Sequence, residues 1–100
     1  MPARRKQFRL RPAAQADLEN IWLYTAERWS PEQADIYHHR IIKVMTALAD
    51  GRLQGRSAEH IRSGYFNYPA GSHLVFFKKA DYGIDVVRVL HQRMAFEQNL

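Results

Sequence analysis

Three side chains in the last third of this 100-residue sequence carry acid–base or anion-binding chemistry: His73, Arg88 and His91. Imidazole titrates near neutral pH, so His73 is a candidate general base or phosphate contact, or simply a polar residue at the entrance of a strand. Arg88 interrupts an apolar run, and an unpaired buried charge is costly. The sequence therefore leaves two interpretations of Arg88 open: it binds a phosphate or a partner's carboxylate, or it pairs with an acid such as Asp17 or Glu19.

The other histidines and the lack of cysteine argue against a metal or cofactor site. His38 and His39 are adjacent in a predicted helix, so they point about 100° apart and do not share a metal-binding face. The chain has no cysteine, which excludes disulfides and thiolate ligands. It also lacks a Walker loop, a GxSxG motif and an HExxH motif. We expect no metal and no cofactor.

Charge is spread unevenly along the chain, whose formal net charge is +5. Residues 1–11 carry five basic residues and no acid, residues 12–35 carry five acids and one arginine, and residues 36–79 carry seven basic residues and two acids. Positive blocks on both sides of a negative segment indicate an anionic partner, either nucleic acid or an acidic protein segment. A mixed surface that keeps the protein in solution is the alternative.

Aromatic residues stand close to two arginines in the second half of the chain. Tyr65, Phe66 and Tyr68 follow Arg56 and Arg62, and aromatic residues interleaved with basic ones can stack bases and hold phosphates. Strand alternation places Phe66 and Tyr68 on one face and Tyr65 on the other. Because both faces are used, at least some of these rings belong to a core, which is the favoured interpretation.

Two amphipathic helices are predicted in the first half of the chain. Apolar residues recur at three- and four-residue steps over 13–29 and again after Ser30, with Asp50-Gly51 as the stop. Ser30 can cap the second helix, and Pro31 suits its first position. Because only Ser30 and Pro31 separate the two helices, they should form an antiparallel hairpin.

Strands are predicted on both sides of this hairpin. A short strand over 6–11 precedes it, a mobile basic loop over 51–63 follows it, and three strand-like runs then form a meander. Alternation along the last run places Arg88 on the same face as three apolar residues. The predicted fold is α+β: an N-terminal strand and an antiparallel helix hairpin packed on a small sheet, completed by a three-strand C-terminal meander and a short C-terminal tail. The three apolar residues that share the predicted face of Arg88 are Ile84, Val86 and Leu90. The three strand-like runs cover 64–68, 73–78 and 84–90, and the C-terminal tail covers 94–100.

Length and hydropathy bound the organisation of the chain. One hundred residues form one domain, residues 1–100. The longest nearly apolar run, residues 74–77, is far too short to cross a bilayer, and the basic start has no apolar run of signal-peptide length. We expect a cytoplasmic protein with no membrane segment.

Three segments of the sequence follow a family pattern: RVLHQRM at 88–94, GSHLVFF at 71–77 and PAAQADLENIW at 12–22. Together they resemble the ParE branch of the RelE/ParE toxin superfamily. The resemblance covers nearly the whole chain, residues 7–98, and the first of the three segments is its most specific part.

The resemblance implies the toxin of a bacterial type II toxin–antitoxin pair. ParE-branch toxins are known as inhibitors of DNA gyrase, and a ParD-like antitoxin neutralises them when its disordered C-terminal part folds onto the toxin. The toxin–antitoxin complex is expected to bind its operator DNA. Under this interpretation the protein binds its target and is not an enzyme. The expected target- or partner-binding residues are Arg88, His91, Gln92, Arg93 and Met94, and the expected antitoxin-binding residues are Trp22, Trp29, Tyr37, Arg56 and Arg62.

The RelE branch of the superfamily supplies an alternative, a ribosome-dependent mRNA endoribonuclease. Such cleavage needs a base, an acid and cations around the phosphorane. Here His73 stands where mRNA-cleaving relatives often carry arginine, and no tyrosine follows Arg93, so gyrase inhibition is favoured. A third hypothesis is a non-toxic chain that only co-represses its operator with the antitoxin. The nuclease alternative would use Arg62, His73, Arg88 and His91.

The end of the last strand and the tail are expected to carry the toxic site. We interpret 88–94 as the exit of that strand, with Arg88 oriented by the fold and the following side chains presented to the target or the antitoxin. Residues 93–100 are short and polar, so their removal should abolish toxicity while sparing the fold.

Overall fold

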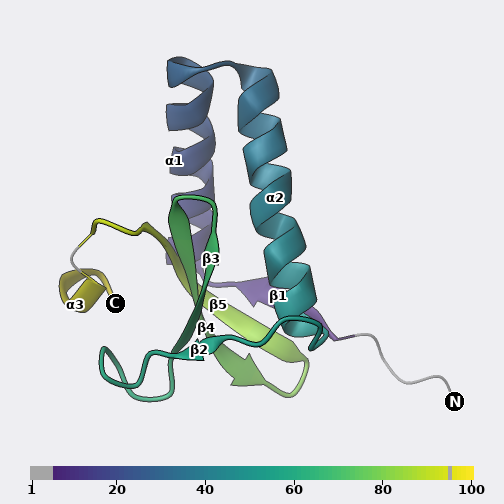
Figure 1. The fold of residues 1–100 in the computed structure, drawn as a ribbon, viewed down its shortest axis with the longest axis vertical. Helices are drawn as coiled ribbons and strands as arrows, with labels where there is room; N and C mark the ends of the chain where they lie inside the picture. The colour runs from purple at the N-terminus through teal and green to yellow at the C-terminus, as the bar shows by residue number, and fades with distance from the viewer. Residues whose placement is uncertain (1–5, 95) are drawn as a thin grey trace, which may run out of the picture.

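The computed structural model describes residues 6–94 and 96–100. A hairpin of two long helices stands on a small twisted sheet, and a short helix near the C-terminus lies at its flank (Figure 1). The predicted α+β fold, with its N-terminal strand, helix hairpin and C-terminal meander, is confirmed. The elements in chain order are β1 (Gln7–Leu10), α1 (Pro12–Arg28), α2 (Pro31–Ala49), β2 (Arg56–Ser57), β3 (Phe66–Ala70), β4 (His73–Ala80), β5 (Gly83–His91) and α3 (Phe96–Asn99).

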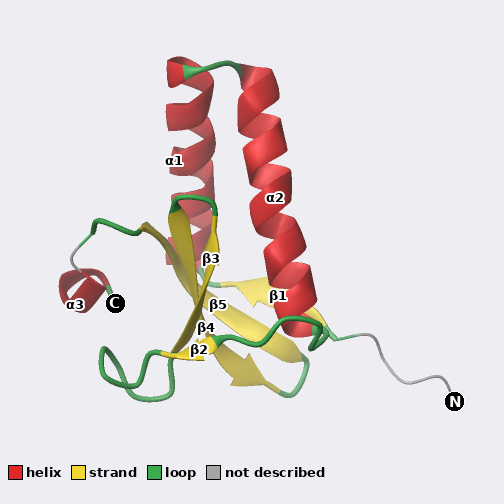
Figure 2. Ribbon diagram, viewed as in Figure 1, coloured by secondary structure: helices red, strands yellow, loops and turns green. Residues whose placement is uncertain are grey.

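The described strands form one sheet in the order β1-β5-β4-β3-β2 (Figure 2). Strand β1 pairs in parallel with the first half of β5, from Gln7 opposite Gly83 to Leu10 opposite Val86, and the other neighbours are antiparallel. The sequence did not predict β2, because two polar residues, Arg56 and Ser57, show no apolar alternation. Their pairing partner on β3 identifies them as a strand.

Local capping explains why the two helices meet at a sharp turn. Ser30 has an extended backbone, and its hydroxyl oxygen accepts the N–H of Gln33 at 3.1 Å, as predicted for the cap of α2. A second tie crosses the hairpin, where the indole Nε1 of Trp22 donates to Asp35 at 2.8 Å. The antiparallel hairpin therefore follows from residues close together in sequence.

The distal half of the hairpin, where α1 and α2 join, extends well beyond the sheet (Figure 1). Large apolar side chains on this part face solvent instead of a core, and Trp29 is 73% exposed. Leu23, Trp29 and Ile36 line three different hollows, so these side chains do not form one patch. The other exposed members are Leu23, Tyr24 and Ile36.

The sheet buries apolar residues on both of its faces. Helices α1 and α2 cover one face through a cluster that includes Leu18, Ile41 and Met45. Tyr65 and Phe76 belong to a second cluster, whereas Phe66 and Tyr68 pack against the first. The predicted division of the three aromatic residues between two faces is therefore confirmed.

A β-bulge changes the facing of β5 from the one that we predicted. Phe76 pairs with Arg88 and Phe77 with Val86, so Val87 is an extra residue on β5. Val86 packs in the first cluster, whereas Val87 and Leu90 pack in the second. The prediction of one shared face for Ile84, Val86, Arg88 and Leu90 is wrong, because the inserted residue resets the alternation.

The segment predicted as a mobile basic loop has an ordered turn and a buried anchor. Ala58 is fully buried in the second cluster. The carboxylate of Glu59 accepts the hydroxyl of Ser63 at 2.9 Å and the N–H of Gly64 at 2.7 Å. These hydrogen bonds lower the pKa of Glu59, so the turn is held by a carboxylate that stays ionised.

In the described part of the chain, none of the helices is long and apolar enough to cross a membrane.

The C-terminal tail packs against the core through apolar side chains, although its sequence looks polar. The ring of Phe96 lies edge-on to that of Phe76 at a centroid distance of 4.9 Å. Phe96 and Leu100 both pack against the second cluster. Removal of residues 93–100 would therefore uncover Phe76, and this packing argues against the prediction that truncation spares the fold.

Candidate functional site

Arg88 is held between α1 and α3. Its Nε and Nη2 donate to the two carboxylate oxygens of Asp17 at 2.7 and 2.9 Å, and its Nη1 donates to the carbonyl oxygen of Asn99 at 2.7 Å. The Arg88 and Asp17 side chains are only 23% and 13% exposed. The hydrogen bonds with Asp17 raise the pKa of Arg88, so the guanidinium is charged. Of the two interpretations of Arg88 left open by the sequence, the structure shows the ion pair with Asp17.

Asp17 also completes the open edge of β5. Strand β1 stops at Leu10, opposite Val86, so no described strand lies beside the second half of β5 on that side. The N–H of Val89 donates instead to Asp17 at 2.9 Å. The single carboxylate of Asp17 thus accepts a hydrogen bond from a strand amide and also orients Arg88. Because the guanidinium binds the carboxylate through two parallel hydrogen bonds, the Arg88 side chain is held rigidly.

Tyr37 on α2 is the hub that ties the β3–β4 turn to the helix hairpin. Its hydroxyl oxygen lies 2.7 Å from Nδ1 of His73 and 3.2 Å from the carbonyl oxygen of Ala70, and it accepts the N–H of Ser72 at 2.9 Å. Gly71 has φ +61°, and a Cβ there would lie 2.5 Å from the Tyr37 ring. Glycine is therefore required both by the turn and by the ring that lies against it.

His73 and His91 face each other across β4 and β5. They are register partners, and their ring centroids are 5.3 Å apart in an edge-on arrangement. Burial lowers the pKa of His73 to about 4, helped by the neighbouring His91 and opposed by Asp17. His73 is therefore neutral at physiological pH. Within residues 6–94 and 96–100, no group of three or more potential ligands could hold a metal ion.

The residues after β5 are fastened to the same β3–β4 turn. The backbone N–H of Gln92 donates to Ser72 at 3.0 Å, and its side-chain amide donates to Gly71 at 3.2 Å. The N–H of Arg93 donates to Nδ1 of His91 at 3.2 Å. Arg93 is exposed, and Met94 beside it is 40% exposed. Residues 91–94, which we call the exit surface, are therefore linked to Tyr37 through His73 and through the turn at Gly71.

The predicted antitoxin-binding residues lie in three places. Trp29 and Tyr37 line one hollow of about 290 Å³ together with Thr25 and Gln33. Trp22 lines a different hollow of about 530 Å³, with Leu18, Leu23 and His38 among its neighbours. The structure thus brings Trp29 and Tyr37 together, next to the exit surface, and separates Trp22 from them. The third place holds Arg56 and Arg62.

Arg56 and Arg62 lie toward the other end of the meander. Arg56 is in β2, which pairs with the start of β3, and Arg62 precedes β3 in the turn closed by Glu59. The five residues of β3, roughly 17 Å of strand, separate this end from the turn at Gly71. The nuclease alternative requires Arg62 to lie close to His73 and His91. In the structure Arg62 lies away from both histidines.

The arrangement is better suited to binding than to acid–base chemistry. Arg88 directs three of its five N–H donors to Asp17 and Asn99, so it orients the end of the chain. His73 is neutral, and its Nδ1 is engaged by Tyr37. What the exit surface presents to solvent is the flexible, apolar Met94 and the charged Arg93, on a backbone fixed by Gln92.

Sequence reasoning missed two parts of this site. The clamp of Gly71 between Tyr37 and Gln92 joins residues from three distant elements, whereas the sequence indicated no more than a turn at Pro69-Ala70-Gly71, of which Pro69 and Ala70 belong to β3. The contact of Arg88 with the carbonyl oxygen of Asn99 had no signal, because a backbone acceptor has no side-chain signature.

Comparisons with known proteins agree with this fold. The family model described as ParE toxin of type II toxin-antitoxin system, parDE, matches residues 8–96. Toxin ParE1 of Mycobacterium tuberculosis is 44% identical over 95 residues, which are 94% of this chain and 97% of that protein. Toxin ParE1 of Caulobacter vibrioides is 37% identical over 89 residues, which are 89% of this chain and 92% of that protein.

A solved structure shares the same architecture. The chromosomal ParDE TA system from P. aeruginosa contains a chain that superposes with a TM-score of 0.73 over 87% of this chain and 96% of its own length, at 19% sequence identity. That likeness concerns the fold. Since the family model spans most of the chain and two relatives exceed one third identity, this chain belongs to the ParE family, the toxins of parDE type II toxin–antitoxin systems.

Proposed function

We propose that this protein arrests growth by binding DNA gyrase and makes or breaks no bond itself. Membership of the ParE branch carries the proposal, because toxins of that branch are known as gyrase inhibitors. A gyrase target places the action in the cytoplasm. The arrangement of the site supports the proposal, since His73 is neutral and Arg88 is already bound to Asp17.

The contact with gyrase is assigned to the exit surface. Gln92 fixes the backbone there through Gly71 and Ser72, so little further ordering is needed when Arg93 and Met94 meet a partner. Arg88 has a different role in this proposal: it positions the chain end through Asn99 and does not touch gyrase.

A ParD-like antitoxin is proposed as the neutralising partner. Its apolar residues would occupy the hollows at Trp22 and at Trp29 and Tyr37, and its acidic residues would meet Arg56 and Arg62. The separation of these places suits an extended segment that orders as it binds. Because Tyr37 adjoins the exit surface, the bound antitoxin would mask that surface. The resulting complex is proposed to bind operator DNA.

Two charge reversals test the proposal separately. Arg93→Glu should abolish inhibition of supercoiling by purified gyrase, whereas Arg56→Glu should leave inhibition intact and weaken binding of the antitoxin. Both arginines are exposed, so each variant should fold like the parent protein. Full inhibition by the Arg93→Glu variant would remove the exit surface from the gyrase contact.

Assays with the same purified protein, and its expression in cells, distinguish the alternative functions. Cleavage of mRNA on ribosomes, with supercoiling unaffected, would replace this proposal with the endoribonuclease, which the facing pair His73 and His91 favours. Induced expression without an antitoxin that leaves growth unchanged would instead support the co-repressor hypothesis.

A further inference from the structure

The side of the sheet that faces away from α1 and α2 carries a row of charged side chains near the turn between β4 and β5. Arg9 on β1 is the register partner of Asp85 on β5, and Asp85 is the partner of Lys78 on β4. The residues next to the row along the strands, such as Ile84 and Phe77, pack in the first cluster under the helices. Because successive side chains of a strand point to opposite sides, the row itself faces away from the helices.

Two further arginines lie on the same side of the sheet. Arg11 follows the end of β1, and its Nε donates to the carboxylate of Asp85 at 2.9 Å. Arg56 on β2 pairs with Asn67, which pairs with Phe76 of the second cluster, so Arg56 also faces away from the helices. We call the four basic residues on this side the cationic face: Arg9, Arg11, Arg56 and Lys78.

The charges of the cationic face are available to a ligand. The three arginines are exposed, and Lys78 is half-buried. Arg9, Arg56 and Lys78 form no ion pair with a residue that the structure describes. The acid in the middle of the row, Asp85, is already paired with Arg11. The face therefore has a surplus of positive charge.

Arg9 is held in an orientation that suits an anion. Its guanidinium lies 3.9 Å from the centroid of the Tyr82 ring. The N–H donors of a guanidinium lie in its plane, so stacking on a ring leaves them able to bind the oxygens of a phosphate. Because the stacked side chain is already ordered, it loses less conformational freedom on binding than an unsupported arginine would.

The spacing of the cations suits the backbone of a nucleic acid. Arg9 and Arg56 lie on the outer strands of the described sheet, four strand spacings or about 19 Å apart. Each cation that meets a phosphate releases counterions, so cations spread over this width add their effects on a polyanion. An amphipathic helix of a protein would need apolar anchors as well. In the described part of the chain, the large apolar side chains that are exposed lie on the helix hairpin or after β5: Leu23, Tyr24, Trp29, Ile36 and Met94.

The aromatic residues near the face favour a duplex over a single strand. Proteins that bind single strands stack the bases on exposed aromatic rings. Tyr65 is buried, and one side of the Tyr82 ring is covered by Arg9. The cationic face thus offers phosphate contacts without a stacking platform, which suits a duplex that is gripped by its backbone.

We propose that the cationic face binds the phosphate backbone of duplex DNA without reading its sequence. Six residues of β5, about 20 Å, separate Asp85 from His91, so this face and the exit surface lie at opposite ends of the sheet. The inference deepens the proposed function and rests on it in one respect: the exit surface would contact gyrase, while the cationic face contacts the DNA that gyrase holds. Inhibition itself stays assigned to the exit surface. Arg56 also belongs to the proposed antitoxin contact, so a bound antitoxin would compete with DNA for it.

The test measures binding of the full chain to a fluorescent DNA duplex of about 20 base pairs, by anisotropy at several salt concentrations. With four phosphate contacts, the logarithm of the affinity should fall with that of the salt concentration at a slope of about −3.6. The affinity should therefore drop by about 100-fold between about 50 and about 200 mM salt. Duplexes of unrelated sequence should bind within about twofold of one another.

Arg9→Gln/Lys78→Gln removes two of the four contacts. This double variant should bind the duplex about tenfold or more weakly at about 50 mM salt, and the slope should fall to about −1.8. An unchanged slope would mean that these two side chains do not meet phosphates.

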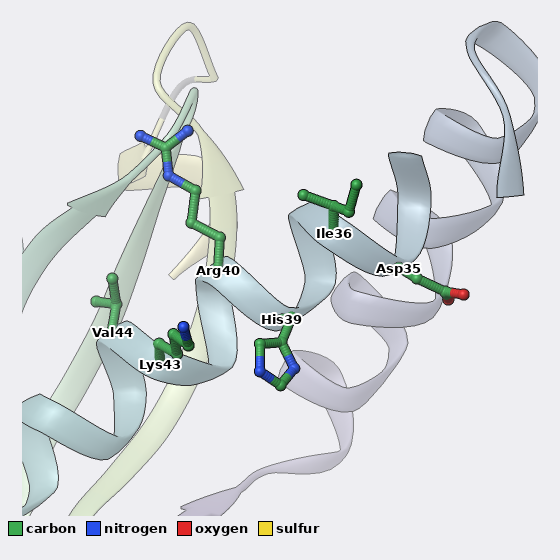
Figure 3. A pocket seen from close by; sticks show the side chains of 6 residues that line it. All are labelled: Asp35, Ile36, His39, Arg40, Lys43 and Val44. Atoms are coloured by element: carbon green, nitrogen blue, oxygen red, sulfur yellow. The ribbon is translucent and has the colours of Figure 1, made fainter. Parts of the chain in front are cut away.

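A matched control separates the cationic face from general charge attraction. Arg40 and Lys43 are exposed on α2, which lies on the other side of the sheet (Figure 3). Arg40→Gln/Lys43→Gln removes the same charge, and it should change the affinity by less than about threefold. Thermal melting followed by circular dichroism checks that both double variants fold. Equal losses in the two double variants, or no binding by the parent chain at about 50 mM salt, would overturn the proposal.

Asp85→Asn supplies a variant that should gain affinity. The change removes the carboxylate between Arg9 and Lys78, so DNA binding should tighten by about threefold. A folded variant with unchanged or weaker affinity would contradict contact of this row with phosphates.

Other nucleic acids and the gyrase assay complete the test. Tighter binding of a single strand or of an RNA duplex than of the DNA duplex would overturn duplex DNA as the ligand. DNA binding without inhibition of supercoiling would refute the gyrase proposal and leave the DNA contact in place. Inhibition without DNA binding would refute the DNA contact alone.

Discussion

Separating Asp17 from Arg88 should destabilise this fold more than any other single loss of a charge. The carboxylate accepts three hydrogen bonds, two from Arg88 at 2.7 and 2.9 Å and one from the N–H of Val89 at 2.9 Å. In Asp17→Asn the amide nitrogen would face donors, so at least one N–H is left without an acceptor. The helix, the strand edge and the chain end are then no longer held at one point.

The expected cost follows from the burial of the pair. Removing one partner of a buried ion pair costs roughly 3–5 kcal/mol. Arg88 keeps 23% of its side-chain surface in contact with solvent and Asp17 keeps 13%, so water recovers part of that loss. We expect the free energy of unfolding to fall by about 2–4 kcal/mol, a large share of the roughly 5–15 kcal/mol typical of small proteins.

Urea unfolding of a double-mutant cycle isolates the pair. The cycle comprises the parent chain, Asp17→Asn, Arg88→Met and the double variant, with Met chosen because its unbranched stem resembles that of arginine. With a slope of about 1–3 kcal/mol per molar urea, the single variants should shift the midpoint by about 1 M or more. The coupling free energy should be about 2 kcal/mol, because each single variant already removes the same hydrogen bonds.

A small coupling would refute the reasoning. If it is below about 0.5 kcal/mol, the pair contributes no more than an exposed surface ion pair. Arg88 would then be free to reach a partner, and its assignment as a positioning residue would be wrong. A circular dichroism spectrum of Asp17→Asn in native buffer serves as the control that the variant still populates the fold.

Three other perturbations have expected outcomes. The pKa of His73 is lowered to about 4 from 6.5, so between these pH values the folded state binds fewer protons than the unfolded chain. The stability that neutral His73 contributes is therefore complete above pH 6.5 and is lost as the pH falls toward 4. In NMR titrations of the imidazole, His91→Ala should raise the pKa of His73, and an unchanged value would contradict the proximity of the two rings. Gly71→Ala places a Cβ 2.5 Å from the Tyr37 ring at a residue with φ +61°. The melting temperature should therefore fall, and the free energy of unfolding should decrease by about 2 kcal/mol or more. A decrease of less than about 0.5 kcal/mol would mean that Tyr37 does not clamp the turn. Phe96→Ala should cost about 1–2 kcal/mol in urea unfolding because the partly buried ring covers the second cluster, and an unchanged midpoint would mean that the tail is dispensable for the fold.

Much of the architecture was determined by residues close together in the sequence. Ser30 and Pro31 force a sharp turn between two amphipathic segments, so the hairpin follows from capping and a four-residue apolar period. The alternation at Tyr65 and Phe66 correctly divided the aromatic residues between two faces, because a strand turns each successive side chain to the opposite side. The run RVLHQRM was enough to suggest the ParE branch, which the family match then showed.

Only the tertiary structure decided how those pieces meet. Asp17 and Arg88 are 71 residues apart, and their pairing depends on where β1 ends and on the bulge at Val87. The second cluster is covered in part by Phe96 and Leu100, so a segment that looks polar in sequence packs against the core. Propensity and periodicity act over a few residues, whereas the partner of a charge or the cover of a sheet face is fixed by contacts between elements distant in sequence.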